Sequence, residues 1–379
     1  MSLADELHAH AASLRSARRP ADVFGPLDGA DLDARLEVLG ASFRSWAAKV
    51  HPDRYVHSVD LTETATEAFQ MLNAWRDLAE RHLRRSARHG GQAVHVGRRD
   101  YGVVRDLPGG DLCDLFAVVD EDGSADDELV LKVTRDPAHN DLLDNEARVL
   151  NHLWSRPQEQ VEVFCRYVPR LRGALDLDDG RRANLLSIAA DHVTLADVQR
   201  AYPKGVEGRT VAWMGNRVFE FLAWLHRQGV VHGAVLADHV LIHPVTHGAV
   251  IVDWCYAVRD WRYPDGPHLG ALPTAQKNRY PQEVFRREAA SPRLDLYLAA
   301  GTLLQTAGVD LWTGKRPTDL GDPLATPIPE GMTEILRGCR LERPAERFAD
   351  AFEVWERWKM AQRRAYGPRK FHPFAMPSV

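Results

Sequence analysis

The sequence has few cysteines, no long apolar run and no excess of basic residues. Its four cysteines are dispersed along 379 residues, with neither the paired spacing of a zinc site nor that of a redox motif: Cys113, Cys165, Cys255 and Cys339. No apolar run approaches the roughly 20 residues that a membrane span needs. The N-terminal residues are polar and acidic, without the basic start and apolar core of a signal peptide. We therefore expect reduced cysteines and a cytoplasmic protein with no membrane partner.

The charge balance and the length narrow the class of protein further. The formal net charge is −5 and the isoelectric point is about 6.4, whereas a nucleic-acid-binding domain is usually basic. Hydrophobic residues make up 45% of the chain and charged residues 27%, which is ordinary for a globular protein. A chain of 379 residues is long enough for two or three domains. We expect a multidomain globular protein without a nucleic-acid partner.

The region from about residue 20 to 86 shows helical periodicity. One apolar stripe recurs at three-to-four spacing, as in a helix that packs on one side: Leu32, Leu36, Leu39, Phe43, Trp46 and Val50. A second stripe follows: Ala65, Phe69, Leu72, Trp75 and Ala79. Between the two, Pro52 and a polar run to Asp60 interrupt the helix. We predict an all-helical domain over residues 1–86, with an antiparallel hairpin, an exposed connector and a further helix at residues 3–17.

The pattern changes after this helical region. Residues 87–99 are polar and basic and contain two adjacent glycines, which is typical of a linker. Runs of β type at 103–107, 115–119 and 129–133 then precede a helix at 140–154 and a strand at 185–189. Later segments are mainly helical, at 210–228, 293–307, 332–340 and 347–361. This order predicts a two-lobed α+β domain at 100–362, with a small lobe at about 100–192, a large lobe at about 193–362 and a basic, Phe-containing tail at 363–379.

The connector of the predicted hairpin carries the tripeptide His51-Pro52-Asp53. Pro52 stiffens such a loop and holds its polar neighbours exposed for a partner. The preceding helix bears basic residues on its polar side, which can attract an acidic surface: Arg35, Arg44 and Lys49. The alternative is a solvated turn in which the Asp53 carboxylate caps a helix.

With these helices around it, the region of about residues 20–86 resembles a J-domain, the module of DnaJ-type co-chaperones. The resemblance covers the segments Asp22–Leu27, Phe43–Tyr55 and Ala68–Trp75. It implies that the His-Pro-Asp loop, together with the basic side of the preceding helix, engages a DnaK-type chaperone ATPase and stimulates its hydrolysis of ATP.

The region from about residue 100 onward contains charged residues in an order that suggests a binding site. Lys132 lies in a predicted strand, and Glu146 on the following helix is placed to supply its counter-charge. Asp253 follows the apolar run 249–252. In order and approximate spacing these residues resemble those of a protein kinase over about 260 residues. The resemblance implies that Lys132 anchors phosphate, that Glu146 pairs with it and that Asp253 binds Mg on ATP.

Further positions agree with the same resemblance. Glu283 in Tyr280-Pro-Gln-Glu283 and Arg347 match an ion pair of the large lobe, and Asp295 matches the acidic residue of its buried helix. A glycine-rich loop is expected near residues 107–112, where only Gly109 and Gly110 are available to cradle phosphates.

The loop expected to carry out catalysis departs from the kinase pattern. After His232, the places of the base, the lysine and the amide metal ligand are taken by Ala234, Leu236 and His239. Phosphoryl transfer depends on positioning and on charge stabilisation, so losing all three groups predicts a pseudokinase without catalytic residues. Two alternatives remain open: Asp238 as a displaced base, and His239 with Asp253 as ligands of a softer metal such as manganese or zinc.

The sequence therefore predicts a J-domain co-chaperone whose kinase-like domain recognises a client protein. The retained Lys132, Glu146 and Asp253 leave binding of ATP with Mg or Mn open. The alternatives are an atypical but active protein serine/threonine kinase, brought to its substrates by the J-domain, and a scaffold that binds no nucleotide.

Overall fold

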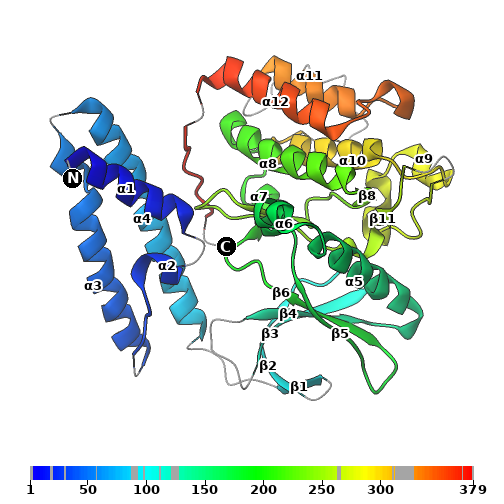
Figure 1. Ribbon diagram of the computed structural model, residues 1–379, viewed down its shortest axis with the longest axis horizontal. Helices are drawn as coiled ribbons and strands as arrows, with labels where there is room; N and C mark the ends of the chain where they lie inside the picture. Colours follow the sequence, from blue (N-terminus) through cyan, green and yellow to red (C-terminus); the bar gives the residue numbers. More distant parts are fainter. Residues whose placement is uncertain are drawn as a thin grey trace. The chain divides into compact units, whose positions relative to one another are not determined.

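The computed structural model divides into two compact units (Figure 1). It describes residues 3–17, 20–29, 31–56, 58–86, 93–96, 99–110, 112–120, 128–262, 266–309, 311, 328–368 and 370–377. The first unit comprises the N-terminal helices together with the short segments His243–His247 and Lys370–Ala375. The second begins at the first strand and contains the other described residues.

The first unit is helical, as its periodicity predicts. Its elements are α1 (Leu3–Ser16), α2 (Pro20–Phe24), α3 (Leu32–Val50), a 3₁₀ turn η1 (Pro52–Tyr55) and α4 (Val59–Ser86). Helices α3 and α4 lie side by side (Figure 1). Asp31 caps α3 by accepting from the Ala34 N–H at 2.8 Å. The core includes the fully buried Leu72 and Trp75 of α4, and the Trp75 indole donates to the Leu14 carbonyl of α1.

The second unit begins with a six-stranded antiparallel sheet. In chain order the strands are β1 (Ala93–Val96), β2 (Arg99–Leu107), β3 (Cys113–Asp120), β4 (Leu129–Thr134), β5 (Leu171–Asp176) and β6 (Arg182–Ser187). Their order in the sheet is β1-β2-β3-β4-β6-β5. Helix α5 (Asn140–Trp154) connects β4 to the later part of the sheet, and α6 (Gln158–Phe164) follows it. Strand β4 and helix α5, which follow one another in the chain, carry two residues of the polar cluster described below, Lys132 and Glu146.

The rest of this unit is mainly helical. Its helices are α7 (Leu195–Ala201), α8 (Gly208–Arg227), α9 (Gln282–Phe285), α10 (Pro292–Thr306), α11 (Glu330–Cys339) and α12 (Ala351–Tyr366). Short strands lie between them: β7 (Val193–Thr194), β8 (Val230–Val231), β9 (Val240–Ile242), β10 (Ala249–Ile251) and β11 (Val258–Arg259). Helices α8 and α12 pack where Gly215 meets Trp358, because a Cβ at Gly215 would overlap the indole ring. Large aromatic side chains fill this core: Phe219, Phe221, Trp254 and Trp358.

Some predicted boundaries are wrong. Strand β1 occupies part of the predicted linker at residues 87–99, because Ala93–Val96 pairs with β2. The strand predicted at 185–189 is β6, which ends at Ser187. The helix predicted at 347–361 begins at Ala351, after the Asp350 cap, and continues to Tyr366, so the tail begins later than residue 363.

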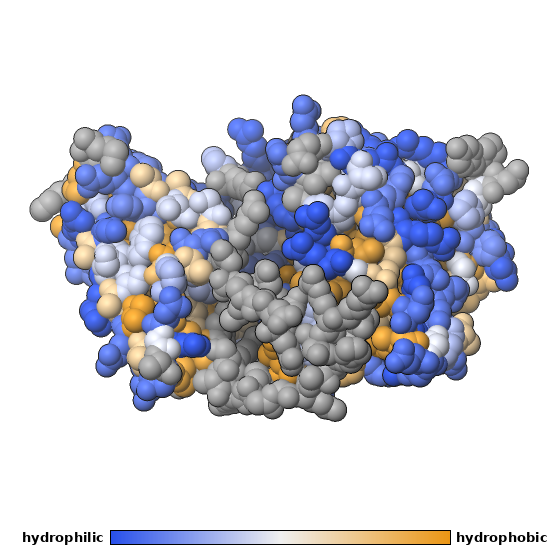
Figure 2. Space-filling view, turned by 60° about the horizontal axis from the view of Figure 1, so that its bottom comes forward, coloured by the Kyte–Doolittle hydropathy of each residue, from blue (hydrophilic) through white to orange (hydrophobic). Residues whose placement is uncertain are grey.

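The surface is consistent with this division into buried cores and polar exteriors. The face shown in Figure 2 is mainly hydrophilic, with apolar residues in small separate groups. Across the described residues, none of the helices combines the length and the apolar character that crossing a membrane requires.

Candidate functional site

The side chain of His51 makes the main contacts of the His-Pro-Asp loop. His51 ends α3, and its Nδ1 accepts from the Asp53 N–H at 3.3 Å, while Pro52 begins the 3₁₀ turn. The His51 ring packs edge-on against Phe69 of α4, with ring centroids 4.9 Å apart. The Asp53 side chain is 86% exposed. His51 therefore caps this turn, in place of the Asp53 cap considered from the sequence, and Asp53 is presented to solvent.

Hydrogen bonds fasten the same loop to both helices. The buried Tyr55 donates from its hydroxyl to the Lys49 carbonyl of α3 at 2.7 Å. Thr62 of α4 donates to the Tyr55 carbonyl at 2.7 Å, and Arg54 donates to the Ala48 carbonyl at 2.9 Å. Hydrogen bonds thus connect the loop to both α3 and α4.

The three basic residues of α3 do not form the single basic side that the sequence interpretation assumed. Arg44 is nine residues from Arg35, and two and a half helical turns place them on opposite sides of the helix. Arg35 donates to the Gly29 carbonyl at 3.3 Å, and the Lys49 ammonium lies 5.3 Å from the centroid of the Trp46 ring. Arg44 is exposed. Lys49 is five residues from Arg44, about 140° round the helix, so these two do not share a side either, and Lys49 is the basic residue of the three that lies nearest the loop.

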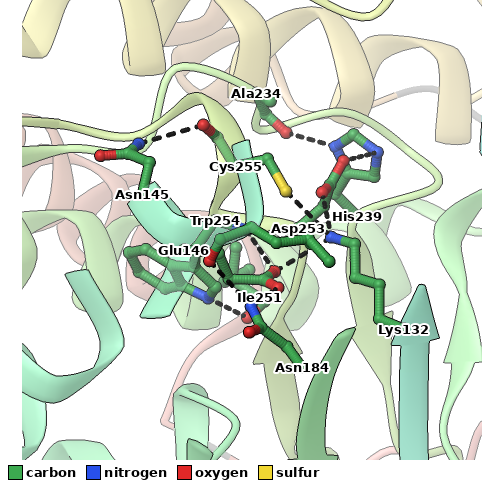
Figure 3. A network of polar contacts seen from close by, with 11 residues as sticks. Lys132, Asn145, Glu146, Asn184, Ala234, His239, Ile251, Asp253, Trp254 and Cys255 are labelled. Atoms are coloured by element: carbon green, nitrogen blue, oxygen red, sulfur yellow. Dashed lines mark hydrogen bonds and ion pairs between the residues drawn. The ribbon is translucent and has the colours of Figure 1, made fainter. Parts of the chain in front are cut away.

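A second polar cluster lies in the other unit, where Lys132 of β4 meets residues from α5 and from the segment after β10 (Figure 3). Its ammonium is 3.0 Å from Glu146 Oε1, 2.6 Å from Asp253 Oδ1 and 3.2 Å from Cys255 Sγ. The sequence-predicted trio of Lys132, Glu146 and Asp253 is therefore brought together. An ammonium has three protons, and here three acceptors of the chain surround it.

Glu146 is fully buried and is held by groups other than the lysine. Its Oε1 accepts from the Trp254 N–H at 3.2 Å, and its Oε2 accepts from the Asn184 amide at 3.0 Å. The same Asn184 amide group donates to the Leu143 carbonyl at 2.9 Å. A buried carboxylate needs such partners in addition to a counter-charge, because desolvation of both ions is costly. The arrangement fixes α5 against the sheet.

The electrostatics of this cluster keep both acidic and basic groups charged. Burial works to lower the pKa of Lys132, but Asp253, Glu146 and the nearby thiols together outweigh it, and the pKa is raised well above its usual value. Burial likewise works to raise the pKa of Asp253, while the charges of Lys132 and His239 lower it overall. Burial raises the pKa of the Cys255 thiol well above its usual value, so this acceptor is a neutral thiol.

His239 has a defined orientation beside Asp253. Its Nδ1 is 2.9 Å from the Ala234 carbonyl, which can only accept, so Nδ1 carries a proton. Its Nε2 then faces Asp253 Oδ2 at 3.2 Å. This contact is favourable when Nε2 is also protonated, or when Nε2 and Oδ2 bind the same cation.

The loop between β8 and β9 lacks polar groups where a kinase has them. Ala234 and Leu236 are buried and contribute only apolar side chains. Asp238 is exposed, and its Oδ2 accepts a hydrogen bond from the Gln276 amide. His232 is buried, which lowers its pKa to about 4. The loop therefore keeps a backbone scaffold without an evident base.

That backbone scaffold depends on Asp295 of α10. Its carboxylate accepts from the His232 and Gly233 N–H groups, each at 2.8 Å. Gly233 has a φ of 76°, and a Cβ there would approach the Tyr256 carbonyl to 2.8 Å, so a side chain is excluded at this turn. The predicted ion pair of Glu283 with Arg347 is also present.

The two glycines predicted to cradle phosphates lie in the turn between β2 and β3. A Cβ at Gly109 would approach the Cys113 carbonyl to 2.9 Å, whereas a Cβ at Gly110 would meet open space. Only Gly109 is therefore required by a close backbone approach. Both glycines are exposed.

Two members of the polar cluster were missed in the sequence. The sequence places Cys255 only among the dispersed, reduced cysteines, and no signal in its spacing connects it to Lys132. Asn184 could have been found, because a lone amide within the apolar run Ala183–Leu186 must bond to something when the strand is buried.

The comparisons with known proteins concern the fold of this second unit. No protein-family model matches the sequence, and no curated protein matches it. The chain is similar to the crystal structure of the Mycobacterium tuberculosis PknI kinase domain, with 16% identity, a TM-score of 0.51 and coverage of 71% of this chain and 98% of that one. It is also similar to the BubR1 kinase domain, with 13% identity, a TM-score of 0.53 and coverage of 73% and 84%. At such identities the similarity concerns fold alone, and this chain contains a protein-kinase-like fold and a helical unit.

Proposed function

We propose that this chain is a co-chaperone whose helical unit recruits a DnaK-type chaperone ATPase and stimulates its ATP hydrolysis. The observation that supports the proposal most is the His51-Pro52-Asp53 loop, anchored between α3 and α4 with an Asp53 side chain that is 86% exposed. The resemblance of this region to J-domains supplies the partner. A rigid loop loses little conformational entropy on binding, so its exposed polar groups can contribute to affinity.

In this proposal the kinase-like domain recognises a client protein and does not transfer phosphate. Ala234 and Leu236 offer no proton acceptor and no cation, and both side chains are buried. Asp238 is the remaining acidic group of the loop, and it already accepts from Gln276. Loss of a general base alone lowers a rate by roughly 10²–10⁴, and the loss of a nearby cation and an amide ligand adds to it.

The co-chaperone activity is tested with the full chain and a DnaK-type ATPase in single-turnover hydrolysis. His51→Gln removes the ring that caps the turn and packs on Phe69, so we expect stimulation to fall at least tenfold. His8→Gln is the matched control, since His8 is an exposed histidine whose Nδ1 bonds within its own helix to Ala4. Undiminished stimulation by the His51 variant would refute the assignment of the loop.

Binding of ATP with a divalent metal ion is a second candidate function, favoured by the intact Lys132–Glu146 pair and by the position of Asp253. The residues fit a metal in one respect: His239 Nε2 and Asp253 Oδ2, 3.2 Å apart, would hold it. Its chemistry there would be to neutralise the phosphates of the nucleotide. An imidazole ligand suits manganese or zinc better than magnesium. The carboxylates and thiol of Glu146, Asp253 and Cys255 also lie within 4.8 Å of one another, but the Lys132 ammonium already bonds to all three.

A thermal-shift titration with ATP tests this second candidate. If the site binds nucleotide, ATP with Mn²⁺ raises the melting temperature of the kinase-like unit, because a ligand of the folded state stabilises it by mass action. Asp253→Ala should abolish the shift, and ATP with Mg²⁺ should give a smaller shift than ATP with Mn²⁺. No shift with either metal ion, in a protein that melts cooperatively, would exclude nucleotide binding and leave a nucleotide-free scaffold.

A further inference from the structure

A groove beside the His-Pro-Asp loop has no part in the functions proposed so far. It encloses about 710 Å³, and one part of its lining comes from the end of η1 and the first turns of α4: Val56, Val59, Thr62, Glu63, Thr66 and Glu67. Phe371 and Pro373, from the far end of the sequence, complete the lining. All of these residues belong to the helical unit. The groove is therefore a feature of this unit alone, built from two distant parts of the sequence.

The C-terminal part of this lining is fixed by several contacts. The Phe371 ring stacks on His247 with centroids 4.5 Å apart, and it packs against the core of the helical unit. The Lys370 ammonium lies 2.8 Å from Glu63 Oε1. The residues that follow Phe371 make further polar or ring interactions: His372, Phe374 and Ala375. This segment therefore forms a wall of the groove and leaves the groove itself open to a ligand.

The polar side chains that line the groove have partners inside the helical unit. The two threonine hydroxyls donate to backbone carbonyls of the loop and of α4, each at 2.7 Å. Both carboxylates form ion pairs with basic residues: Glu63 with Lys370, and Glu67 with Arg15 of α1. Because the polar lining is satisfied within the unit, the groove favours an apolar ligand over a nucleotide, a sugar or an ion.

Two apolar side chains of the groove are exposed. Val56 is 60% exposed and Val59 is 85% exposed, and together with Phe371 and Pro373 they give the groove four apolar lining residues. Single exposed apolar residues are common on protein surfaces, whereas a group of them marks an interaction site more often. An apolar segment of a protein partner would remove these side chains from water, which is favourable.

The exposed valines are continuous with the His-Pro-Asp loop. In a 3₁₀ turn such as η1, residues three apart lie on the same side, so Val56, which ends the turn, follows Asp53 on one side of it. Val59 begins α4 three residues later. The exposed Asp53 carboxylate and the two exposed valines thus form one surface. A partner that binds the loop would also meet the groove.

We propose that the groove receives an apolar segment of the chaperone ATPase, so that this partner binds the His-Pro-Asp loop and the groove together. The inference rests on the proposed co-chaperone function and adds a second contact to it. It also gives the C-terminal segment a role, because Phe371 and Pro373 then form part of the surface that binds the ATPase.

The test titrates the full-length chain into a DnaK-type ATPase and follows single-turnover ATP hydrolysis. Val59→Asp places a carboxylate in the apolar contact, so the concentration of the chain that gives half-maximal stimulation should rise at least tenfold. The fold should tolerate this change, because the side chain is 85% exposed and an acidic residue is favourable in the first turn of a helix. Val59→Leu keeps an apolar side chain and should not raise that concentration.

Two further variants show where the effect arises. Pro373 is exposed and lines the groove from the C-terminal segment, so Pro373→Asp should raise the half-maximal concentration as Val59→Asp does. Met360→Asp is the control, since Met360 is a 54% exposed apolar residue of α12 in the other unit and does not line the groove. This control should titrate like the wild type.

The outcomes separate the groove from the co-chaperone function. If the wild type does not stimulate the ATPase, the proposed function fails and the groove proposal fails with it. If the wild type stimulates and His51→Gln removes the stimulation, but Val59→Asp and Pro373→Asp titrate like the wild type, only the groove proposal is overturned. Unchanged titrations, together with a wild-type dimer that Val59→Asp dissociates in analytical ultracentrifugation, would assign the groove to a second copy of the chain and would also overturn the proposal.

Discussion

The structure gives its most specific prediction for a variant that lacks the Lys132 ammonium. The side chains of Lys132 and Glu146 are 7% and 1% exposed, and that of Asp253 is 22% exposed. Lys132→Met keeps most of the side-chain volume but removes the ammonium that Glu146 and Asp253 share. Breaking a buried ion pair by removing one partner costs roughly 3–5 kcal/mol. We expect a loss of this size in the free energy of unfolding of the kinase-like unit.

Differential scanning calorimetry of the wild type and the variant measures this loss as a lower melting temperature. At roughly 2–4 °C per kcal/mol for a domain of this size, the transition of the kinase-like unit should fall by roughly 6–20 °C. The matched control is Lys359→Met: Lys359 pairs with Glu356 at 2.6 Å, but the side chains are 39% and 43% exposed. That exposed pair should contribute less than about 1 kcal/mol.

The pH dependence of the variant gives a second, independent check. Lys132 lowers the pKa of Asp253 in the wild type, so this stabilisation is present above the unfolded pKa of about 3.9 and is lost as the pH falls through the lower folded value. Without Lys132, the largest influence that lowers the Asp253 pKa is lost, so the carboxylate contributes less stability above its unfolded pKa. The difference in the free energy of unfolding between the variant and the wild type should therefore become smaller from pH 7 to pH 4. A loss no larger than that of the Lys359 control, or a gap that widens toward low pH, would refute the description of a buried ion network.

Two further changes test the core and the loop of the same unit. Gly215→Ala places a Cβ against the Trp358 ring, so it should lower the free energy of unfolding, measured with a chemical denaturant, by roughly 1–3 kcal/mol. At an exposed position in a helix the same change would stabilise the protein, so a gain in stability would contradict the close packing of α8 on α12. Burial lowers the pKa of His232 to about 4, against about 6.5 in the unfolded chain. The stability that the neutral, buried ring contributes to the folded state is therefore fully present above pH 6.5 and is lost as the pH falls toward 4. His232→Phe should therefore flatten the decline in stability between pH 6.5 and pH 4 by roughly 3 kcal/mol, and an unchanged pH profile would show that this histidine is not buried in the neutral form.

The sequence predicted those parts of the site that depend on residue type and spacing. Lys132, Glu146 and Asp253 are charged residues next to apolar strands and helices, and burial of such groups requires that they meet. Cys255 could not be predicted as a partner of Lys132, because that contact depends on a turn which brings Sγ to 3.2 Å from the ammonium. Short runs of β-type residues between turn residues predicted β2, β3 and β4, whereas β1 has only four residues and lies at the edge of the sheet.

The basic residues of α3 show a different limit of sequence interpretation. Arg35, Arg44 and Lys49 were grouped because all three are basic and lie outside the apolar stripe. Helix geometry separates Arg35 from Arg44, and the Arg35 guanidinium is used locally to hold the Gly29 carbonyl. A count of basic residues on a helix therefore does not show that they share one side. That depends on the angular position of each residue around the helix axis and on its local hydrogen bonds.

The measurement that tests the central claim most directly follows the γ-phosphate of labelled ATP in a mixture of this chain and a DnaK-type ATPase. The proposed co-chaperone function predicts that the label appears as free phosphate, faster than with the ATPase alone, and that His51→Gln removes the acceleration. It also predicts no label on protein, with either Mg²⁺ or Mn²⁺. Label transferred to this chain or to another protein, and lost in Asp253→Ala, would contradict the account and make Asp238 the first candidate for the base.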